Sequence, residues 1–202
     1  MPASWKVDQC LSNRKDKTLE FNMDSKFTIE THRLKLVPLS ITDDDVTVVD
    51  KILNDPGHNG NDFPAGTDFG QVYIRPASLD HFPKHGYGAW KYIEKASNQS
   101  IGMGGMLYKP FFEEGPIIHY SLLVEYRGQG LATEAVEGCI GYAEKIGVKK
   151  LHACIREDNI KSIELIERMG FVLEDEHYKY PRFLDGSHLV LRLYTKKFWF
   201  QV

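Results

Sequence analysis

The clearest chemical signal in this 202-residue sequence is a short glycine-bearing loop that runs from Glu125 to Thr133. A helical pattern follows it. The first backbone N–H groups of a helix have no partner within the helix, so together with the helix dipole they bind anions, phosphate above all. Glycines let a ligand approach the backbone because they carry no Cβ. We therefore predict a phosphate site on Arg127-Gly128-Gln129-Gly130-Leu131-Ala132. The alternative is an ordinary turn that caps a helix.

Two regular elements must hold this loop in place. The stretch before it, Pro116 to Val124, is an apolar and β-branched run of strand length. The stretch after it, Gln129 to Ile146, predicts a helix because apolar residues recur at steps of three and four. These apolar positions are Leu131, Ala135, Cys139, Tyr142 and Ile146.

The rest of the chain predicts an α/β or α+β domain. Further strands are expected at residues 27–37, 87–94, 101–108, 149–155, 171–178 and 188–194, and further helices at 43–53 and 158–169. Residues 54–86 are rich in Gly, Pro, Asn and Asp and predict a long irregular segment. This order favours one mixed, mostly antiparallel sheet flanked by helices. The domain is expected to span residues 27–202, and the polar residues 1–26 are expected to form a tail outside it.

Composition gives little reason to expect several classes of partner. The formal net charge of -3 gives no electrostatic reason to expect nucleic acid or an anionic membrane, and no apolar run is long enough to span a bilayer. The 3 cysteines are widely spaced without a CxxC, which favours a reducing compartment over a disulfide framework or a zinc site. We expect a cytoplasmic protein that binds no metal and is a monomer or homodimer.

Three segments together resemble the GNAT superfamily of N-acetyltransferases. Arg127 to Ala132 matches the Arg/Gln-x-x-Gly-x-Gly/Ala pyrophosphate motif of that family, and Glu125 to Ala135 is similar to its RimJ/RimL-like branch. Glu30 to Leu39 resembles the opening strand of the same branch, and Asn159 to Phe171 resembles its N-x-x-S … E-x-x-G-F ending. Three motifs in the expected order are far more specific than any one of them.

The resemblance implies a GNAT fold, in which acetyl-CoA enters a V-shaped gap between two strands that splay apart, the fourth and fifth in chain order. Here these would be Pro116 to Val124 and Lys149 to Ile155, opened by a bulge near the end of the first strand. The pantetheine arm would pair with the backbone of Leu122 and Val124. A backbone N–H of Leu123 or Val124 would polarise the thioester carbonyl. The pyrophosphate would lie on the loop described above.

The resemblance also implies direct attack by a neutral amine on the thioester, in a ternary complex. Acetyl-CoA would be the cosubstrate, and the acceptor would be a primary amine on a protein N-terminus or a small molecule. Asn159 and Ser162 match the N-x-x-S motif. Asn159 would hydrogen-bond the pantetheine or a neighbouring backbone group, and Ser162 would reach the sulfur as the acid. The alternatives are a helix cap for Asn159 and a surface serine for Ser162.

The base is where the chain departs from its relatives. Many of them carry an acid before a Gly-Tyr pair on the strand that precedes the loop, but here Ile117 and His119 fill the acid and glycine positions. His119 is the candidate base because an unperturbed histidine has a pKa near 6.5, and the alternative is a strand histidine bonded to a neighbour. The pair Glu113–Glu114 comes next, and His188 and Tyr194 are weaker candidates.

The absent strand acid leaves a second function open, a catalytically silent module that binds or senses acyl-CoA. A nucleotide-binding α/β protein is a further alternative. It has less support, because the sequence lacks the Gly-Lys-Ser/Thr of a P-loop and the third glycine of a dinucleotide fingerprint.

Overall fold

The computed structural model describes residues 26–55, 70–112, 115–181 and 187–198. Within these ranges eight strands form one sheet in the order β1-β2-β3-β4-β5-β6-β8-β7. The pairing of β5 with β6 is parallel, and the other pairings are antiparallel. The strands are β1 (Ile29–Glu30), β2 (Leu34–Pro38), β3 (Ala89–Glu94), β4 (Gln99–Leu107), β5 (Ile117–Leu122), β6 (Lys150–Ile155), β7 (Val172–Pro181) and β8 (His188–Lys197). The predicted mixed, mostly antiparallel sheet is confirmed.

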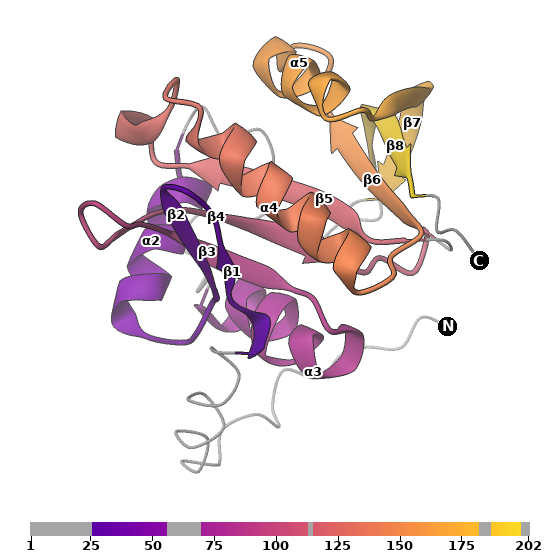
Figure 1. Ribbon diagram of the computed structural model, residues 1–202. Coiled ribbons are helices and arrows are strands. Elements are labelled where there is room, and N and C mark those ends of the chain that lie inside the picture. The colour runs from indigo at the N-terminus through magenta and orange to yellow at the C-terminus, as the bar shows by residue number, and fades with distance from the viewer. Residues whose placement is uncertain (1–25, 56–69, 113–114, 182–186, 199–202) are drawn as a thin grey trace.

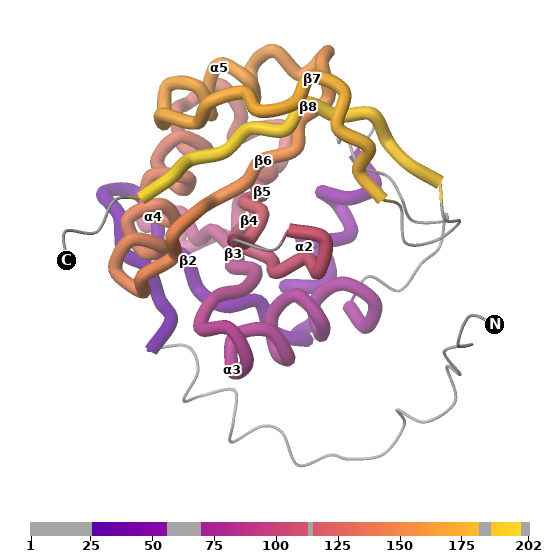
Figure 2. Tube along the Cα trace, turned by 90° about the vertical axis from the view of Figure 1, so that its right-hand side faces the viewer, coloured from indigo at the N-terminus to yellow at the C-terminus, as the bar shows by residue number. Residues whose placement is uncertain are grey.

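Helices cover both faces of this sheet (Figure 1). They are α2 (Asp43–Leu53), the π-helical segment η1 (Gly70–Leu79), α3 (His81–His85), the 3-10 turn η2 (Val124–Tyr126), α4 (Leu131–Lys145) and α5 (Ile160–Arg168). Figure 2 shows the strands passing between α4 on one side and α2 on the other. None of the described helices combines the length and the apolar character needed to cross a membrane.

The core is divided between the two faces. On one face, α4 buries Leu131, Ala135 and Cys139 in a cluster that also holds residues of α5 and of the central strands. These three positions belong to the predicted apolar stripe, so the pattern correctly identified the buried side of the helix. On the other face, α2 and η1 pack a second cluster against β3 and β4, around residues such as Ile52 and Met103. We call these the α4 face and the α2 face.

The sheet opens between β5 and β6. In the part of the chain that the structure describes, one register pair joins these strands, Ile117 with His152, and the His152 N–H donates to the Pro116 carbonyl over 3.0 Å. Beyond this point β6 diverges from β5 (Figure 1) and instead pairs along its whole length with β8. The predicted V-shaped divergence between these two strands is therefore present.

Three predicted elements differ from the structure. Residues 27–37 are not one strand but the hairpin β1–β2, because the Thr31 N–H donates to the Leu34 carbonyl over 2.9 Å and closes a turn. Residues 70–85 are helical rather than irregular, since Ile74 and Ala77 are buried against the second cluster. The predicted bulge near Leu122 to Val124 is wrong as well. The β4–β5 register is unbroken through Leu122, and the chain then turns into η2.

Some predictions fall outside the described residues. The tail up to residue 25, the middle of the predicted irregular segment (56–69) and the pair Glu113–Glu114 belong to this group.

Candidate active site

The predicted phosphate loop lies directly at the start of α4. Gly128 and Gly130 both adopt left-handed backbone conformations, with φ of 77° and 75°. Residues other than glycine rarely adopt this conformation. Gly130 is the N-cap of α4 and offers no side chain to the first turn. The first recorded backbone bond of the helix runs from the Glu134 N–H to the Gly130 carbonyl over 3.1 Å. The N–H groups before Glu134 therefore face an exposed loop without an intrahelical acceptor.

Side chains of the loop brace its backbone. Arg127 Nε donates to the Leu122 carbonyl over 2.9 Å, and the same guanidinium bonds to the carboxylate of Asp55 at the end of α2. The amide of Gln129 donates to the Glu125 carbonyl over 3.0 Å. Arg127 and Gln129 therefore have a structural role in the loop, and their cofactor-binding role stays a prediction.

A cluster of side chains that the sequence analysis did not single out borders the loop. Glu134 Oε1 accepts from the Thr31 hydroxyl over 2.6 Å, and Glu134 Oε2 accepts from Arg33 Nε over 2.7 Å. Arg33 Nη1 also donates to the Gln129 carbonyl over 2.9 Å. Burial alone would raise the pKa of Glu134, but the hydrogen bonds from Thr31 and Arg33 and the guanidinium charge outweigh it and lower this pKa to about 2.

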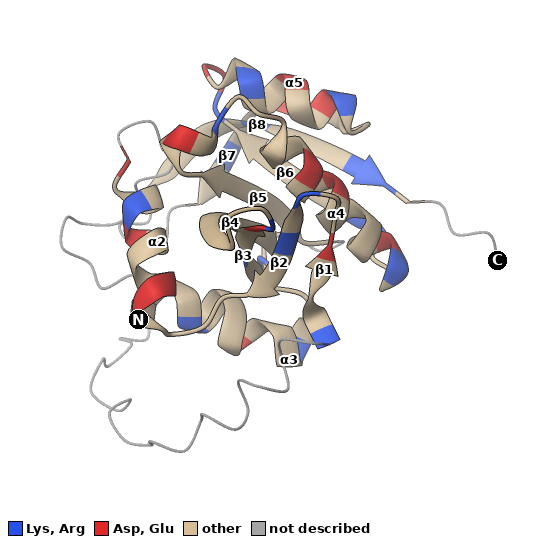
Figure 3. Ribbon diagram, turned by 60° about the vertical axis from the view of Figure 1, so that its left-hand side comes forward, with Lys and Arg blue, Asp and Glu red and all other residues tan. Residues whose placement is uncertain are grey.

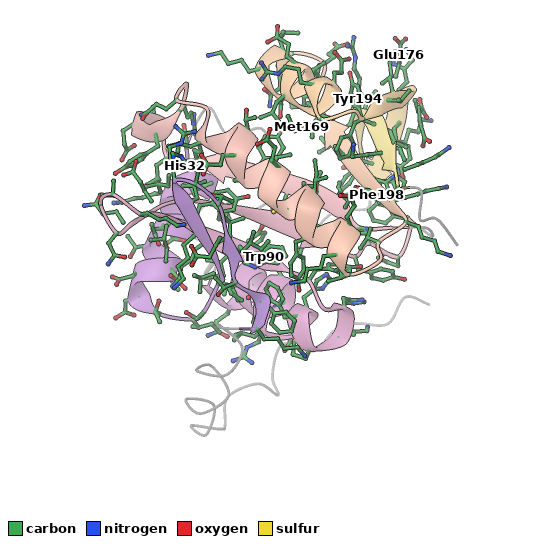
Figure 4. All side chains as sticks on the ribbon, viewed as in Figure 1. His32, Trp90, Met169, Glu176, Tyr194 and Phe198 are labelled. Atoms are coloured by element: carbon green, nitrogen blue, oxygen red, sulfur yellow. The ribbon has the colours of Figure 1, made fainter. Side chains whose placement is uncertain are left out.

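An exposed groove continues from this cluster over the first half of α4. It has a volume of about 540 Å³. His32 from the β1–β2 turn and Met169 after α5 both line it, and Figure 4 labels these two side chains. Figure 3 shows that acidic and basic residues mix around α4 and the β1–β2 turn, so no charge of a single sign covers this side of the molecule. The groove lies beside the phosphate loop, because Gly130 is also part of its wall.

The backbone N–H and C=O groups of successive residues along β5 point alternately toward β4 and toward β6. The Leu123 N–H donates to the Ile101 carbonyl on the β4 side over 2.9 Å, whereas the Pro116 carbonyl accepts from His152 on β6. Because backbone direction alternates along a strand, odd-numbered positions of β5 bond to β4 and even-numbered positions face β6. Tyr120 therefore turns its backbone groups toward the gap.

The backbone groups of Leu122, Leu123 and Val124, which are predicted to contact the cofactor, differ in the hydrogen bonds they already make within the protein. The Leu122 carbonyl already accepts from Arg127 over 2.9 Å, which leaves its N–H facing the gap. The Leu123 N–H is bonded to Ile101 and is not open to a thioester in this arrangement. Val124 is exposed at the start of η2 and is the other predicted donor. The contacts of all three residues with a ligand stay predictions.

The candidate base and the candidate acid lie on opposite faces of the sheet. His119 is on the α2 face, where its Nε2 lies 2.7 Å from the hydroxyl of Tyr73 in η1. Burial raises the pKa of Tyr73 far above its usual value, so this hydroxyl keeps its proton and can donate it to Nε2. This is the bond to a neighbour that the alternative interpretation expected. A base role for His119 stays a prediction.

Ser162 lies on the α4 face beside a tyrosine that the sequence analysis missed. Ser162 Oγ is 2.7 Å from the hydroxyl of Tyr120. Asn159 is the N-cap of α5, and its side chain accepts from the Ser162 N–H over 3.3 Å. The capping alternative for Asn159 is therefore found, and its contact with pantetheine stays a prediction. The only sequence signal for Tyr120 was its position after His119 in the Gly-Tyr slot.

The weaker candidates make other contacts. Tyr194 is 1% exposed and belongs to the core of the α4 face, where its hydroxyl donates to Glu167 over 3.4 Å. His188 pairs with Pro181 at the far end of β8, outside the stretch of β8 that pairs with β6.

The comparison with known families identifies the fold and then the family. Residues 33–172 match the model of the acetyltransferase (GNAT) domain. The chain belongs to this family, as the three sequence motifs predicted. It is similar to the uncharacterized N-acetyltransferase YjdG of Bacillus subtilis (strain 168), with 24% identity over 162 residues, which cover 77% of this chain and 96% of that protein. Membership of the family supports acetyl transfer from acetyl-CoA to an amine.

Solved structures share the fold at low identity. A ribosomal-protein-S5-alanine acetyltransferase from Vibrio fischeri aligns with a TM-score of 0.64 and 22% identity, covering 84% of this chain and 96% of that one. The microcin C7 self-immunity acetyltransferase MccE, solved in complex with acetyl-CoA and AMP, aligns with a TM-score of 0.62 and 18% identity, covering 82% of this chain and 93% of that one. At these identities the likeness concerns the fold.

Proposed function

We propose that this protein is an acetyl-CoA-dependent N-acetyltransferase that acts on a primary amine, on a protein N-terminus or a small molecule, by direct attack in a ternary complex. The observation that carries the proposal is the position of the phosphate loop. It follows β5 immediately, at the end where β5 and β6 have parted. A ligand with a diphosphate at one end and an extended arm at the other would lie along this path.

The choice of acetyl-CoA and of the acceptor class rests on the relatives. MccE was solved with acetyl-CoA, and the Vibrio fischeri neighbour acts on a ribosomal protein. Together with the opening and closing motifs of the chain, these neighbours support placing it in the RimJ/RimL-like branch. A cytoplasmic location would suit such substrates.

The direct mechanism is supported by the state of the two cysteines that the structure describes. Burial raises the pKa of Cys139 and of Cys154 to about 12. The thiolate is the nucleophilic form of cysteine, so neither side chain is suited to accept the acetyl group at neutral pH. This supports direct attack of the amine on the thioester. We propose that His119 takes the proton that the amine loses, from the α2 face.

An assay of thiol release tests this proposal. Purified protein is mixed with acetyl-CoA and a panel of amines that includes peptides with free alanine and serine N-termini, and polyamines. Release of CoA thiol that requires both the protein and an amine is expected.

Because His119 is bonded to Tyr73 and no acid stands at Ile117, the silent acyl-CoA-binding module is the second candidate. Tight binding of acetyl-CoA without thiol release for any amine would favour that module.

A further inference from the structure

A buried histidine lies at the fork where β5 and β6 part. His152 on β6 is 7% exposed and forms the one described register pair between these strands, with Ile117. Its ring stacks on the ring of Phe112 with 4.7 Å between the centroids, and Phe112 packs with Ile117 in a buried cluster. Residues two apart along a strand share a face, so Ile117 lies on the same face as His119. His152 therefore borders the gap from the α2 face, as His119 does.

Two hydrogen bonds in series connect this ring to a carboxylate. His152 Nδ1 lies 2.9 Å from Thr195 Oγ1 on β8, and this hydroxyl donates to Glu174 Oε2 on β7 over 2.8 Å. A threonine hydroxyl has one proton to donate, so Thr195 Oγ1 accepts its other bond from His152 Nδ1. The neutral imidazole is therefore held as the tautomer with a proton on Nδ1 and a lone pair on Nε2.

The lone pair of His152 Nε2 is open to a ligand. No hydrogen bond to this atom is present in the described part of the chain, and the atom is not among the fully buried ones there that lack a partner. The anchoring strand β8 lies on the side of β6 away from β5. The ring is thus fixed from one side, and its Nε2 can accept a proton from a group in the gap.

The surroundings of His152 keep it neutral and able to accept a proton. Burial lowers its pKa below the ordinary 6.5 against the opposing effect of Glu174, and Lys150 lowers this pKa further. Glu174 is itself 40% exposed, and Lys197 Nζ lies 4.0 Å from its Oε1. The titratable groups that face the ring or its partners are Lys150 and Cys154 on β6, Glu174 and Tyr178 on β7, Lys197 on β8 and His119 on β5.

We propose that His152 is a catalytic residue that takes the proton which the acceptor must lose before it attacks, and that Thr195 and Glu174 position it. This inference rests on the proposed function. A primary amine is mostly an ammonium ion at pH 7, since even an α-amino group has a pKa of about 8. One N–H bond of the ammonium breaks, the proton bonds to His152 Nε2, and the electron pair stays on the nitrogen as the nucleophile.

The remaining protons balance as well. Once the nitrogen has bonded to the acetyl carbon, it loses a second proton, which is the one that His119 is proposed to take. The sulfur keeps the electron pair of the C–S bond and takes one proton from solvent, so each transfer releases one proton net. In the meantime Glu174, through Thr195, stabilises the imidazolium of His152, as the acid of a catalytic triad stabilises its histidine.

The pH dependence of kcat/KM tests this role, with the amines that react in the thiol-release assay. In wild type, activity should fall only below about pH 6.5, where histidines become protonated. In His152→Gln the acid limb should move up to the pKa of the amine itself, about 8 for a peptide N-terminus and about 10 for an alkylamine. One pH unit below that pKa the variant should be about tenfold slower than wild type, and above it the two should be equal. An equal loss at every pH would indicate a structural role and overturn the inference.

A second set of variants keeps the test valid if His152→Gln folds poorly. Thr195→Val keeps the shape of the side chain without the hydroxyl and should move the acid limb in the same direction, and Thr195→Ser should restore the wild-type profile. Ser78→Ala is the control, because it removes a buried hydroxyl that donates to the Leu39 carbonyl over 2.6 Å. This control should lower stability and leave the limb in place. An unmoved limb in Thr195→Val would contradict the positioning role.

Nitrogen NMR of His152 tests the arrangement without turnover. At neutral pH the proton should be on Nδ1, and Glu174→Gln should lower the pKa of the ring because a stabilising charge is lost. A proton on Nε2 would overturn the inference. If no amine releases thiol, the proposed function falls and the catalytic role of His152 falls with it. If thiol is released but the pH profiles of His152→Gln and wild type are parallel, this inference alone falls.

Discussion

The guanidinium of Arg33 donates to the carboxylate of Glu134 over 2.7 Å and so ties the β1–β2 turn to the first turn of α4. The same guanidinium donates to the Gln129 carbonyl over 2.9 Å. The proposed phosphate loop is therefore held from outside by a residue about a hundred positions earlier in the chain. Its shape depends on an ion pair, and this makes it sensitive to pH.

Glu134→Gln should destabilise the fold in a pH-dependent way. The folded-state pKa of Glu134 is lowered to about 2 from an ordinary value of 4.5, so the unfolded chain binds more protons between these pH values. The contribution of Glu134 is therefore fully present above pH 4.5 and is lost as the pH falls toward 2. Because Arg33 is 43% exposed, solvent screening limits the effect to about 1 kcal/mol. Urea denaturation at a series of pH values measures it. A constant difference between wild type and variant down to pH 2 would contradict this assignment.

Gly130→Val should weaken acetyl-CoA binding by roughly 10- to 100-fold, because it places a side chain beside the N–H groups of the loop and strains the turn that presents them. Gly147→Val is a matched control. Gly147 has φ of 78° against 75° for Gly130 and lies at the other end of α4. Both variants should lose similar amounts of thermal stability, but only Gly130→Val should lose affinity in calorimetry. Equal affinities would show that the phosphates bind elsewhere.

Asp55→Asn tests whether Arg127 contacts phosphate. In the structure Asp55 bonds to the guanidinium of Arg127, so its carboxylate competes with any anion for that group. If Arg127 binds the cofactor, removal of the charge should raise the affinity for acetyl-CoA several-fold and make binding more sensitive to salt. If Arg127 only braces the loop, the affinity should stay the same or fall. Calorimetry at two salt concentrations distinguishes the two results.

Tyr73→Phe should move the acid limb of the pH–rate profile, provided that His119 is the base. The Tyr73 hydroxyl lies 2.7 Å from His119 Nε2, and a donor at that nitrogen favours the neutral imidazole. Its removal should raise the pKa of His119 and shift the acid limb of kcat/KM to higher pH. His119→Ala should abolish the limb. An unmoved limb in Tyr73→Phe would direct attention to the pair Glu113–Glu114.

Patterns of neighbouring residues predicted those structural features that depend on residues close together in the chain. The apolar stripe identified the buried side of α4 from Leu131 to Cys139, although its last member, Ile146, is exposed. The predicted start of the helix at Gln129 lies close to the observed start at Leu131. The hairpin β1–β2 was missed because its turn at Thr31 contains no glycine or proline. The helical stretch from Gly70 to Leu79 was missed because glycine and Pro76 indicate loops, whereas burial stabilises the helix here.

The sequence indicated candidate site residues only where they belong to a motif of consecutive or closely spaced residues. Arg33 and Glu134 are 101 positions apart, and Tyr120 and Ser162 are 42 apart. Only the packing of α4 and α5 on the sheet brings these pairs together. Each member alone is an ordinary residue of its element, so neither contact has a signature in a single sequence.

A crystal structure determined with acetyl-CoA tests the central claim most directly. Oxygens of the diphosphate should accept hydrogen bonds from the N–H groups between Gly128 and Ala132, and the thioester should lie between β5 and β6. A diphosphate bound elsewhere on the protein, or a pantetheine arm that leaves the gap between these strands unused, would contradict the account.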